Sequence, residues 1–363
     1  MIYRVFDPKG YDGIFEWPRK AAATALALML ASAVLPTPAA GRPAPPEKPD
    51  FTNLSLEELL NIDITPINVL GSHTHLSGEF MVGYRYSFQR FAGDLDGTRE
   101  VGAAEVLAHY PYYHTFMNQQ MHMTEVMYAP NDRLTLMGMG QFMKMDMGHQ
   151  LANGSTFNTH SEGVGDTELV AIYNLLGNPH RLGHRLMLSA GLSLPTGSVD
   201  ERYFGKVLEY EMQTGSGTFD VLPGVTYIGS TESWSWGAQL AGVIHTGSND
   251  HDYRVGDMYR IGAWGHYKIS DWVGPLLRME WKQWATIHGS DPNLVASVNP
   301  ASDARLQAGQ RLDVLAGVQF YVPEGTFKGL RLGLEGGAPA YQSLAGPNLK
   351  MDWLLSFNLS FSF

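Results

Sequence analysis

The chain has 363 residues, of which 44% are hydrophobic and 17% are charged, and its formal net charge is −11. Cysteine is absent, which excludes disulfides, cysteine-ligated metals and thiol catalysis. The negative charge and the lack of a basic run argue against a nucleic-acid partner. The chain has 40 glycines and 11% aromatic residues, but no apolar run of about 20 residues beyond its N-terminal region. This composition indicates a transmembrane β-barrel.

The N-terminal region has the pattern of a secretory signal. Arg19 and Lys20 precede an apolar stretch at 21–35, and small residues suited to cleavage follow at 37–40. Residues 1–40 are therefore predicted to be an N-terminal extension and a signal peptide.

Residues 41–70 are predicted to be a Pro-rich linker followed by a short periplasmic helix. Proline at 41–50 favours an extended chain. Ser55 and Glu58 form a capping box ahead of an apolar stripe that includes Leu59. Two interpretations of the helix stay open: a plug or docking segment, or a cover over the inner mouth of a barrel.

Residues 71–363 are predicted to form the barrel. Apolar and polar side chains alternate along this region, as Phe80 and Val82 do against Met81 and Gly83. A period of two is typical of a strand with one face toward lipid. The fold class is therefore all-β, a transmembrane antiparallel up-and-down β-barrel. Its predicted strands, about twelve and each near the roughly 9–11 residues needed to cross a bilayer, are 78–89, 117–128, 133–146, 165–176, 184–194, 218–229, 233–246, 258–268, 272–285, 310–322, 329–337 and 351–363.

The predicted connections alternate in length. The long ones are 90–116, 147–164, 195–217, 247–257, 286–309 and 338–350, and the short ones are 129–132, 177–183, 230–232, 269–271 and 323–328. Outer-membrane barrels have long extracellular loops and short periplasmic turns. With an even number of strands, both termini are then expected in the periplasm.

The last strand indicates the cellular location. Residues 351–363 alternate large apolar residues with small or polar ones and end on Phe363. This resembles the C-terminal signal by which bacterial outer-membrane proteins are recognised for insertion. We therefore expect a bacterial outer-membrane location, with outer-membrane lipids and, through Phe363, the barrel assembly machinery as partners.

Nine of the 17 methionines lie between 117 and 147, all at odd positions. Odd positions share one face of a strand. In 133–146, Leu134 and Leu136 belong to the lipid face, so the inward residues are Met137, Met139, Gln141, Met143 and Met145. For 117–128 two registers stay open. A four-residue turn turns His122 inward and Met121 to lipid, and a three-residue turn does the reverse.

Two strands carry a family resemblance. One has Gly-Asp at 165–166 and ends near Tyr173, and the next closes on Leu-Pro-Thr-Gly at 194–197. This pattern looks like the outer-membrane transporter family named for the meta-pathway of phenol degradation, and the Met-rich hairpin resembles a subgroup of it. The resemblance covers about 70–363. It implies an outer-membrane barrel and transport, but it assigns no substrate.

The function favoured by these patterns is a channel or transporter for small hydrophobic or aromatic solutes through a narrow, Met-lined lumen. No catalytic residue and no resident cofactor are expected. The residues predicted to line the path are Met81, Arg85, Met137, Met139, Gln141, Met143, Met145, Arg185, Arg278, Glu280, Arg311 and Asp313.

Two alternatives stay open. Thioether sulfur and imidazole are suitable ligands for copper, so the barrel is alternatively a soft-metal protein with His122, Met137, Met139 and Met143 as ligands. The second alternative is an outer-membrane hydrolase. For that alternative, His160 and Ser161 are neighbours, but no nucleophile motif surrounds them.

Overall fold

The computed structural model describes residue 69, residues 71–178 and residues 182–363. The signal peptide, the Pro-rich linker and the short helix, all predicted before residue 69, lie outside this part of the chain. Among the described residues, no helix has the length and apolar character needed to cross a membrane.

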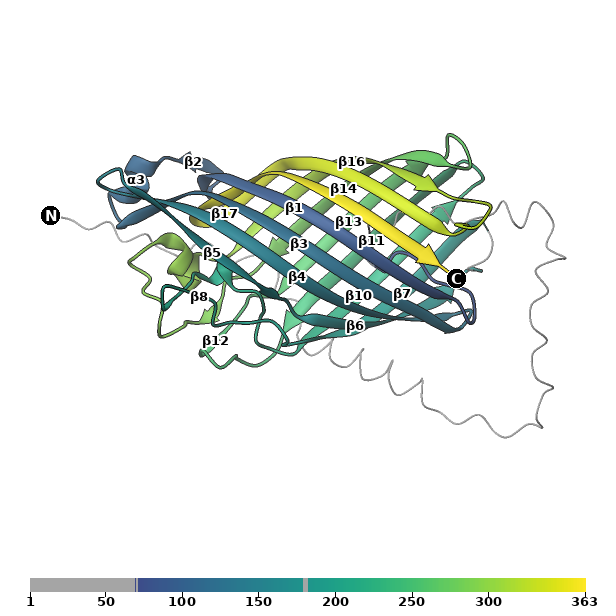
Figure 1. The fold of residues 1–363 in the computed structure, drawn as a ribbon, viewed down its shortest axis with the longest axis horizontal. Helices are drawn as coiled ribbons and strands as arrows, with labels where there is room; N and C mark the ends of the chain where they lie inside the picture. Colours follow the sequence, from purple (N-terminus) through teal and green to yellow (C-terminus); the bar gives the residue numbers. More distant parts are fainter. Residues whose placement is uncertain (1–68, 70, 179–181) are drawn as a thin grey trace. The chain divides into compact units, whose positions relative to one another are not determined.

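The described residues form a closed antiparallel β-barrel (Figure 1). Each wall strand pairs with its neighbours in the chain, and β17 pairs with both β16 and β1, which closes the ring. The wall strands within this part of the chain are β1 (Phe80–Gly97), β3 (Tyr112–Asn131), β4 (Leu134–Leu151), β6 (Thr167–Leu176), β7 (Gly183–Leu194), β10 (Asp220–Ser230), β11 (Trp234–His245), β13 (Met258–Tyr267), β14 (Val273–Trp284), β16 (Gly309–Tyr321) and β17 (Leu330–Ser362).

Strand β17 fills two positions of the ring. Its first half pairs with β16 and its second half pairs with β1, and Leu344 stands at the join of the two halves. The side chain of Gln342 also exchanges hydrogen bonds with the backbone of Met351 across the fold-back. Because β17 contributes two positions, the eleven wall strands of the described chain occupy twelve positions around the ring, which agrees with the predicted number of about twelve. The long connection predicted at 338–350 is wrong, because all of this range is strand within β17.

The strands at one end of the barrel are longer than predicted. Most of 90–116 and 147–164, expected as loops, is strand: β1, β3 and β4 extend into these ranges, and β2 (Arg99–Val101) and β5 (Thr156–Val164) pair beside them. Helix α3 (Ala103–Leu107) lies at the tip. Apolar alternation stops where an outer face no longer meets lipid, but backbone pairing does not require it. The hydrophobic pattern therefore marked the lipid band rather than the strand ends.

The two ends of the barrel differ in their connections. At the end that carries the C-terminus, consecutive strands are joined by turns, such as Asp132 and Arg133 between β3 and β4; we call it the short-turn end. At the opposite, long-loop end, the connections hold β8 (Arg202–Tyr203), β9 (Lys206–Val207), η2 (Tyr210–Met212), β12 (Tyr253–Arg254), β15 (His288–Gly289), η3 (Pro300–Ser302) and η4 (Ala304–Leu306). Of the predicted long connections, 195–217, 247–257 and 286–309 are confirmed, whereas 90–116 and 147–164 are mostly strand and 338–350 is strand throughout.

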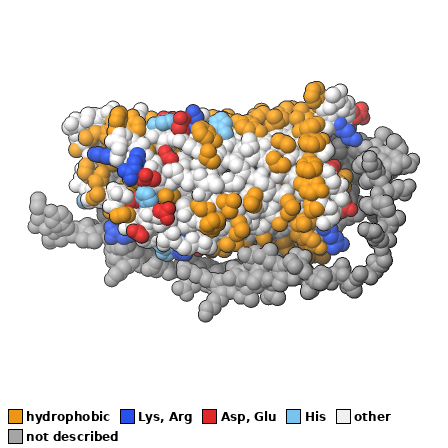
Figure 2. Space-filling model, turned by 60° about the horizontal axis from the view of Figure 1, so that its bottom comes forward, with side chains coloured by type: hydrophobic (Ala, Val, Ile, Leu, Met, Phe, Trp, Pro, Cys, Tyr) orange, Lys and Arg blue, Asp and Glu red, His pale blue; other side chains and the backbone are white. Residues whose placement is uncertain are grey.

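The outer face of the wall is apolar. Exposed aromatic residues include Trp234 and Tyr267, which pair at the ends of β11 and β13, and also Tyr259 and Trp353. On the face shown in Figure 2, a band of hydrophobic side chains crosses the barrel near one end, and most of the charged side chains lie toward the other end. An apolar belt with aromatic ends is the surface that a barrel presents to lipid.

Candidate functional site: a lumen with two unlike walls

One inner wall of the barrel is made of methionine. It consists of the inward methionines of β1, β3 and β4, which we call the sulfur wall: Met81, Met117, Met121, Met123, Met127, Met137, Met139, Met143, Met145 and Met147. They face one another across the strands, as Met127 does Met137 and Met121 does Met143. Those near the two ends are buried, with Met145 and Met147 at 0% exposure, whereas Met121 and Met123 are partly accessible.

The register of the β3–β4 hairpin explains why all these residues share one face. Asn131 pairs with Leu134, but Tyr128 pairs with Leu136, so one extra residue of β3 bulges near Pro130. Proline has no N–H to donate to a ladder, and a bulge is where strands accept it. Because of this extra residue, odd-numbered residues of β3 pair with odd-numbered residues of β4 beyond the bulge. The interior of 117–128 is therefore sulfur, which is one of the two facings left open by the sequence.

His122 is consequently not in the lumen. It pairs with Phe142, and its Nδ1 lies 2.8 Å from the hydroxyl of Tyr84 on the outer face. Its prediction as a metal ligand beside Met137, Met139 and Met143 is wrong, because the bulge turns the even positions of β3 outward. Glu125, in contrast, faces inward opposite Met139.

The other wall consists of ion pairs on β14, β16 and the first half of β17. The Arg278 guanidinium donates to both oxygens of Glu335 at 2.8 and 2.9 Å and to Glu280 at 2.9 Å. Lys282 and Arg311 continue the chain of contacts, at 2.7 Å from Glu280 and 2.8 Å from Asp313 respectively. We call these six residues the ion-pair wall. Strands β4 and β14 lie six of twelve positions apart in the ring, so the two walls face each other.

A narrow gap lies in the interior beside the sulfur wall, and we call it the central chamber. Arg85, Met123, Glu125 and Met139 line it, and it is too small to admit a water molecule. The Arg85 Nε donates to Asn358 Oδ1 at 2.5 Å. The chamber therefore combines a cation, an anion and two thioethers around a narrow space.

The short-turn end of the lumen is closed by the chain that precedes β1. Val69 packs with Met81, Met127 and other inward apolar residues from strands all around the ring. His73 Nε2 lies 3.4 Å from the sulfur of Met81, and the N–H of His75 donates to Thr135 on β4. We call residues 71–79 the inner segment. The sequence placed closure at a helix before residue 69, and it gave no signal for the inner segment.

The long-loop end is closed by residues 195–217. Leu208 and Met212 from this loop pack onto Met117, Met145 and Met147 at the top of the sulfur wall. In the described chain, this apolar cluster and the inner segment close the lumen at opposite ends. The apolar pair Leu208 and Met212, unusual in a surface loop, is the signal that sequence reasoning missed.

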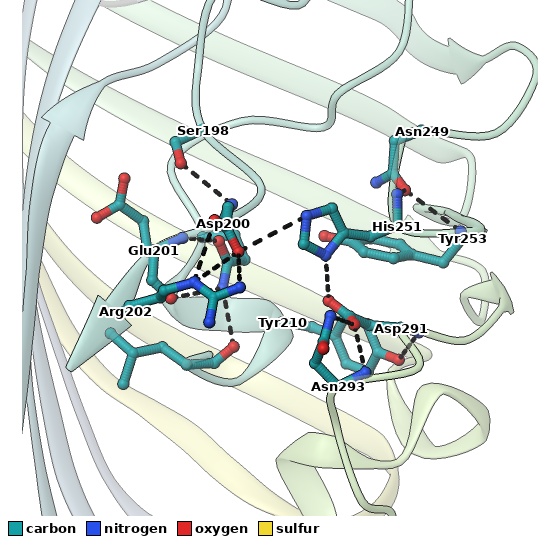
Figure 3. A network of polar contacts seen from close by, with 12 residues as sticks. Ser198, Asp200, Glu201, Arg202, Tyr210, Asn249, His251, Tyr253, Asp291 and Asn293 are labelled. Atoms are coloured by element: carbon teal, nitrogen blue, oxygen red, sulfur yellow. Dashed lines mark hydrogen bonds and ion pairs between the residues drawn. The ribbon is translucent and has the colours of Figure 1, made fainter. Parts of the chain in front are cut away.

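Polar contacts tie this loop to its neighbours (Figure 3). His251 Nδ1 lies 2.7 Å from Asp291, and its Nε2 lies 3.7 Å from Asp200. The backbone N–H of Asp291 donates to the Tyr210 hydroxyl at 3.0 Å. Three long loops therefore meet around one imidazole.

The motif at 165–166 and 194–197 anchors the same loop. The Asp166 carboxylate accepts from the N–H of Gly197 at 2.9 Å and from that of Ser216 at 2.7 Å. A Cβ on Gly197 would lie 2.6 Å from the Cα of Gly215, so only glycine permits this approach. Asp166 thus fixes both ends of residues 195–217 to the rim of the barrel.

The twelve residues predicted to line the path all lie on the inner surface of the barrel. Those on the inner face of their strands are Met81, Arg85, Met137, Met139, Gln141, Met143, Met145, Arg185, Arg278, Glu280, Arg311 and Asp313. Met139 and Arg85 border the central chamber, whereas Met81 and Met137 belong to the apolar layer at the short-turn end.

A closed antiparallel ring with an apolar belt outside and charges inside defines an outer-membrane β-barrel with a porin-like fold. The family described as "Putative MetA-pathway of phenol degradation" matches residues 114–319, more than half of the chain. The chain belongs to this family. No curated protein matches the sequence.

One solved structure shares the fold, and two others are more distantly similar. An outer-membrane channel from Pseudomonas putida is similar over 83% of this chain and 100% of its own, with 13% identity and a TM-score of 0.55. The β-domain of the Bordetella autotransporter BrkA, with 12% identity over 79% of this chain and 100% of its own, has a TM-score of 0.42. The monoaromatic hydrocarbon channel CymD, with 9% identity over 80% of this chain and 89% of its own, has a TM-score of 0.38.

Proposed function

We propose that this protein is an outer-membrane channel for small hydrophobic or aromatic solutes, with its short-turn end in the periplasm and its long-loop end outside the cell. The observation that carries the proposal is the sulfur wall. Thioethers are apolar, flexible and polarisable, and they make favourable contacts with aromatic rings. A row of them beside a chamber suits solutes that vary in shape.

The ion-pair wall supports the same proposal from the other side of the lumen. Each of its charges has a partner, so a passing aromatic ring need not strip water from a free charge. The name of the family, which refers to phenol degradation, agrees with an aromatic solute. Passage requires the inner segment and residues 195–217 to move, because both occupy the lumen ends.

The absence of cysteine makes a clean labelling test available. Met123 borders the chamber, whereas Met279 on β14 is 46% exposed on the outer face. The variants Met123→Cys and Met279→Cys are each labelled in urea with a bulky thiol reagent, refolded and placed in liposomes. Swelling is then followed with benzoate and with arabinose.

Unlabelled protein should admit benzoate faster than arabinose. The label on Met123→Cys should lower benzoate entry severalfold, and the label on Met279→Cys should leave it unchanged. Equal effects of the two labels, or no entry above that of empty liposomes for the unlabelled barrel, would contradict the proposal.

A second test concerns the closure at the short-turn end. A variant that begins at Phe80 lacks the inner segment and should show higher conductance in planar bilayers than the full chain. Unchanged conductance would mean that the inner segment does not obstruct the path.

Copper is the second candidate cargo, and the observation in its favour is the direct pairing of sulfurs across β3 and β4. Cu(I) prefers such soft ligands. Uptake of Cu(I) into the same liposomes distinguishes the two candidates. Loss of that uptake in Met121→Leu/Met143→Leu, with benzoate entry retained, would favour copper.

A further inference from the structure

A buried cluster of two imidazoles and one carboxylate lies above the sulfur wall, at the long-loop end. His114 is on β3, His149 is on β4, and Glu209 comes from the loop 195–217. One donor atom from each lies within 4.8 Å of the other two. All three side chains are buried, with both histidines at 1% exposure.

Two features of the wall bring the histidines together. His114 pairs directly with His149 across β3 and β4. A bulge at Thr115 shifts the register between His114 and Phe116, so the even-numbered His114 faces inward with the odd-numbered Met117. Bulges re-aim side chains in this way next to functional sites.

The donor atoms of the cluster lack partners. Both ring nitrogens of His114, the Nδ1 of His149 and the Oε2 of Glu209 are buried without a hydrogen bond. The shortest ion-pair contact, from His114 Nε2 to Glu209 Oε1, is 3.9 Å, too long for a hydrogen bond. Leaving a buried polar atom unpaired costs about 1–3 kcal/mol, and here each of the three side chains has at least one such atom.

The surroundings hold the ligands in position. Thr159 on β5 lies 2.8 Å from His149 Nε2, and a proton held on that nitrogen leaves Nδ1 free to bind. Asn299 donates to Glu209 Oε1 at 2.9 Å and to the Tyr112 hydroxyl at 2.6 Å. Partners that orient an imidazole and a carboxylate are typical of metal sites.

We infer that His114, His149 and Glu209 bind a divalent first-row transition metal, with Zn²⁺ and Cu²⁺ the best candidates. Two imidazoles and one carboxylate form a known zinc ligand set, which leaves a fourth position for water. Donors about 2.0 Å from a tetrahedral ion are about 3.3 Å apart, so the gaps in the set close by at most about 1.5 Å.

Such an ion would tie the loop to the wall. Two ligands stand on adjacent strands and the third stands one residue before η2, whose Met212 covers the sulfur wall. Metal binding at this site does not require that the barrel passes a solute. It can therefore be tested on the folded protein alone.

The test uses the full-length barrel without an affinity tag, refolded with EDTA and then freed of it. Zn²⁺ and Cu²⁺ are titrated separately against a competing chelator, and metal content is measured after dialysis. We expect one ion per barrel. His114→Gln, His149→Gln and Glu209→Gln should each weaken binding at least 100-fold. The matched control is His184→Gln at the short-turn end, which should bind as the parent does.

Two further measurements keep the outcome clear if a ligand variant folds poorly. Thr159→Val keeps all three ligands and should weaken binding about 10–100-fold. Zn²⁺ should also slow amide hydrogen exchange at residues 206–212 in the parent but not in Glu209→Gln. Absence of a bound ion in the parent, unchanged affinity in all three ligand variants, or equal loss in His184→Gln would overturn the site.

Discussion

The two walls of the lumen fill the interior of the barrel with opposite chemistry. The sulfur wall fills its share of the interior with flexible apolar side chains that need no partners. The ion-pair wall fills its share with charges, each of which depends on its neighbour. Arg278, for example, contacts both Glu335 and Glu280. The difference teaches that one wall can adapt to a solute while the other holds the shape of the barrel.

The largest expected effect comes from breaking the ion-pair wall. Glu335 is 1% exposed and binds Arg278 through both oxygens. Glu335→Gln should lower the free energy of unfolding by about 3–5 kcal/mol, because a buried guanidinium loses its two-oxygen carboxylate partner and keeps only Glu280. Urea unfolding in lipid vesicles measures this. Glu324→Gln, an exposed change in a short turn, should cost less than about 0.5 kcal/mol.

A cavity in the sulfur wall should cost somewhat less. Met127 is 1% exposed and packs with Met81 and Met137. Met127→Ala should lower the free energy of unfolding by about 2–4 kcal/mol, because the layer around it cannot collapse fully. Met279→Ala on the outer face leaves no internal cavity and should cost clearly less in the same unfolding assay. Equal costs would show that the inner methionines are not packed as described.

Conservative substitutions should cost more stability in the ion-pair wall than in the sulfur wall. Arg278→Lys loses a planar fork that fits Glu335 and should cost about 1.5–3 kcal/mol. Met121→Leu keeps volume and apolarity and should cost less than about 1.5 kcal/mol. Unfolding midpoints of the two variants give the comparison directly. If Met121→Leu is the more costly change, the sulfur wall is the rigid one.

The smallest effect concerns the inner segment, which docks on the sulfur wall. Burial alone would raise the pKa of Glu79, but hydrogen bonds from His75 and from the N–H of Leu76 hold this pKa below the ordinary value of 4.5. The contribution of Glu79 to docking is therefore present above pH 4.5 and lost as the pH falls through the lowered pKa. Hydrogen-exchange protection of residues 71–77 should drop over that range.

The matched variant for this pH effect is Glu79→Gln. It cannot titrate, so protection of the inner segment should change less with pH than in the parent chain. A parallel decline in both proteins would assign the pH dependence to another group.

The sequence predicted the barrel because alternation and loop lengths are local signals. It did not predict the bulge at Pro130 or the one at Thr115, since an extra unpaired residue leaves no trace in a period of two. The first bulge decided that His122 faces outward and Met121 inward. The second bulge turns His114 inward beside His149, although a regular period of two in β3 would place this even-numbered residue on the outer face.

Loop contacts escaped prediction for a different reason. Asp166 binds the N–H groups of residues that lie about 30 and 50 positions further along the chain. Leu208 and Met212 likewise find their partners only after the wall exists. A hydrophobic period does not predict such contacts. Neither the closure of the long-loop end nor the position of Glu209 in it could therefore be predicted from the sequence.

The seam between β1 and β17 has a consequence for the order of assembly. Phe80 and Phe363 exchange both backbone hydrogen bonds, and Met81 pairs with Ser362, so the first and last strands of the wall meet. Contacts between residues so distant in the chain form slowly. Neighbouring hairpins can form while the chain is incomplete, but the seam cannot. Until Phe363 arrives, β1 has an open edge, which pairing with β17 closes.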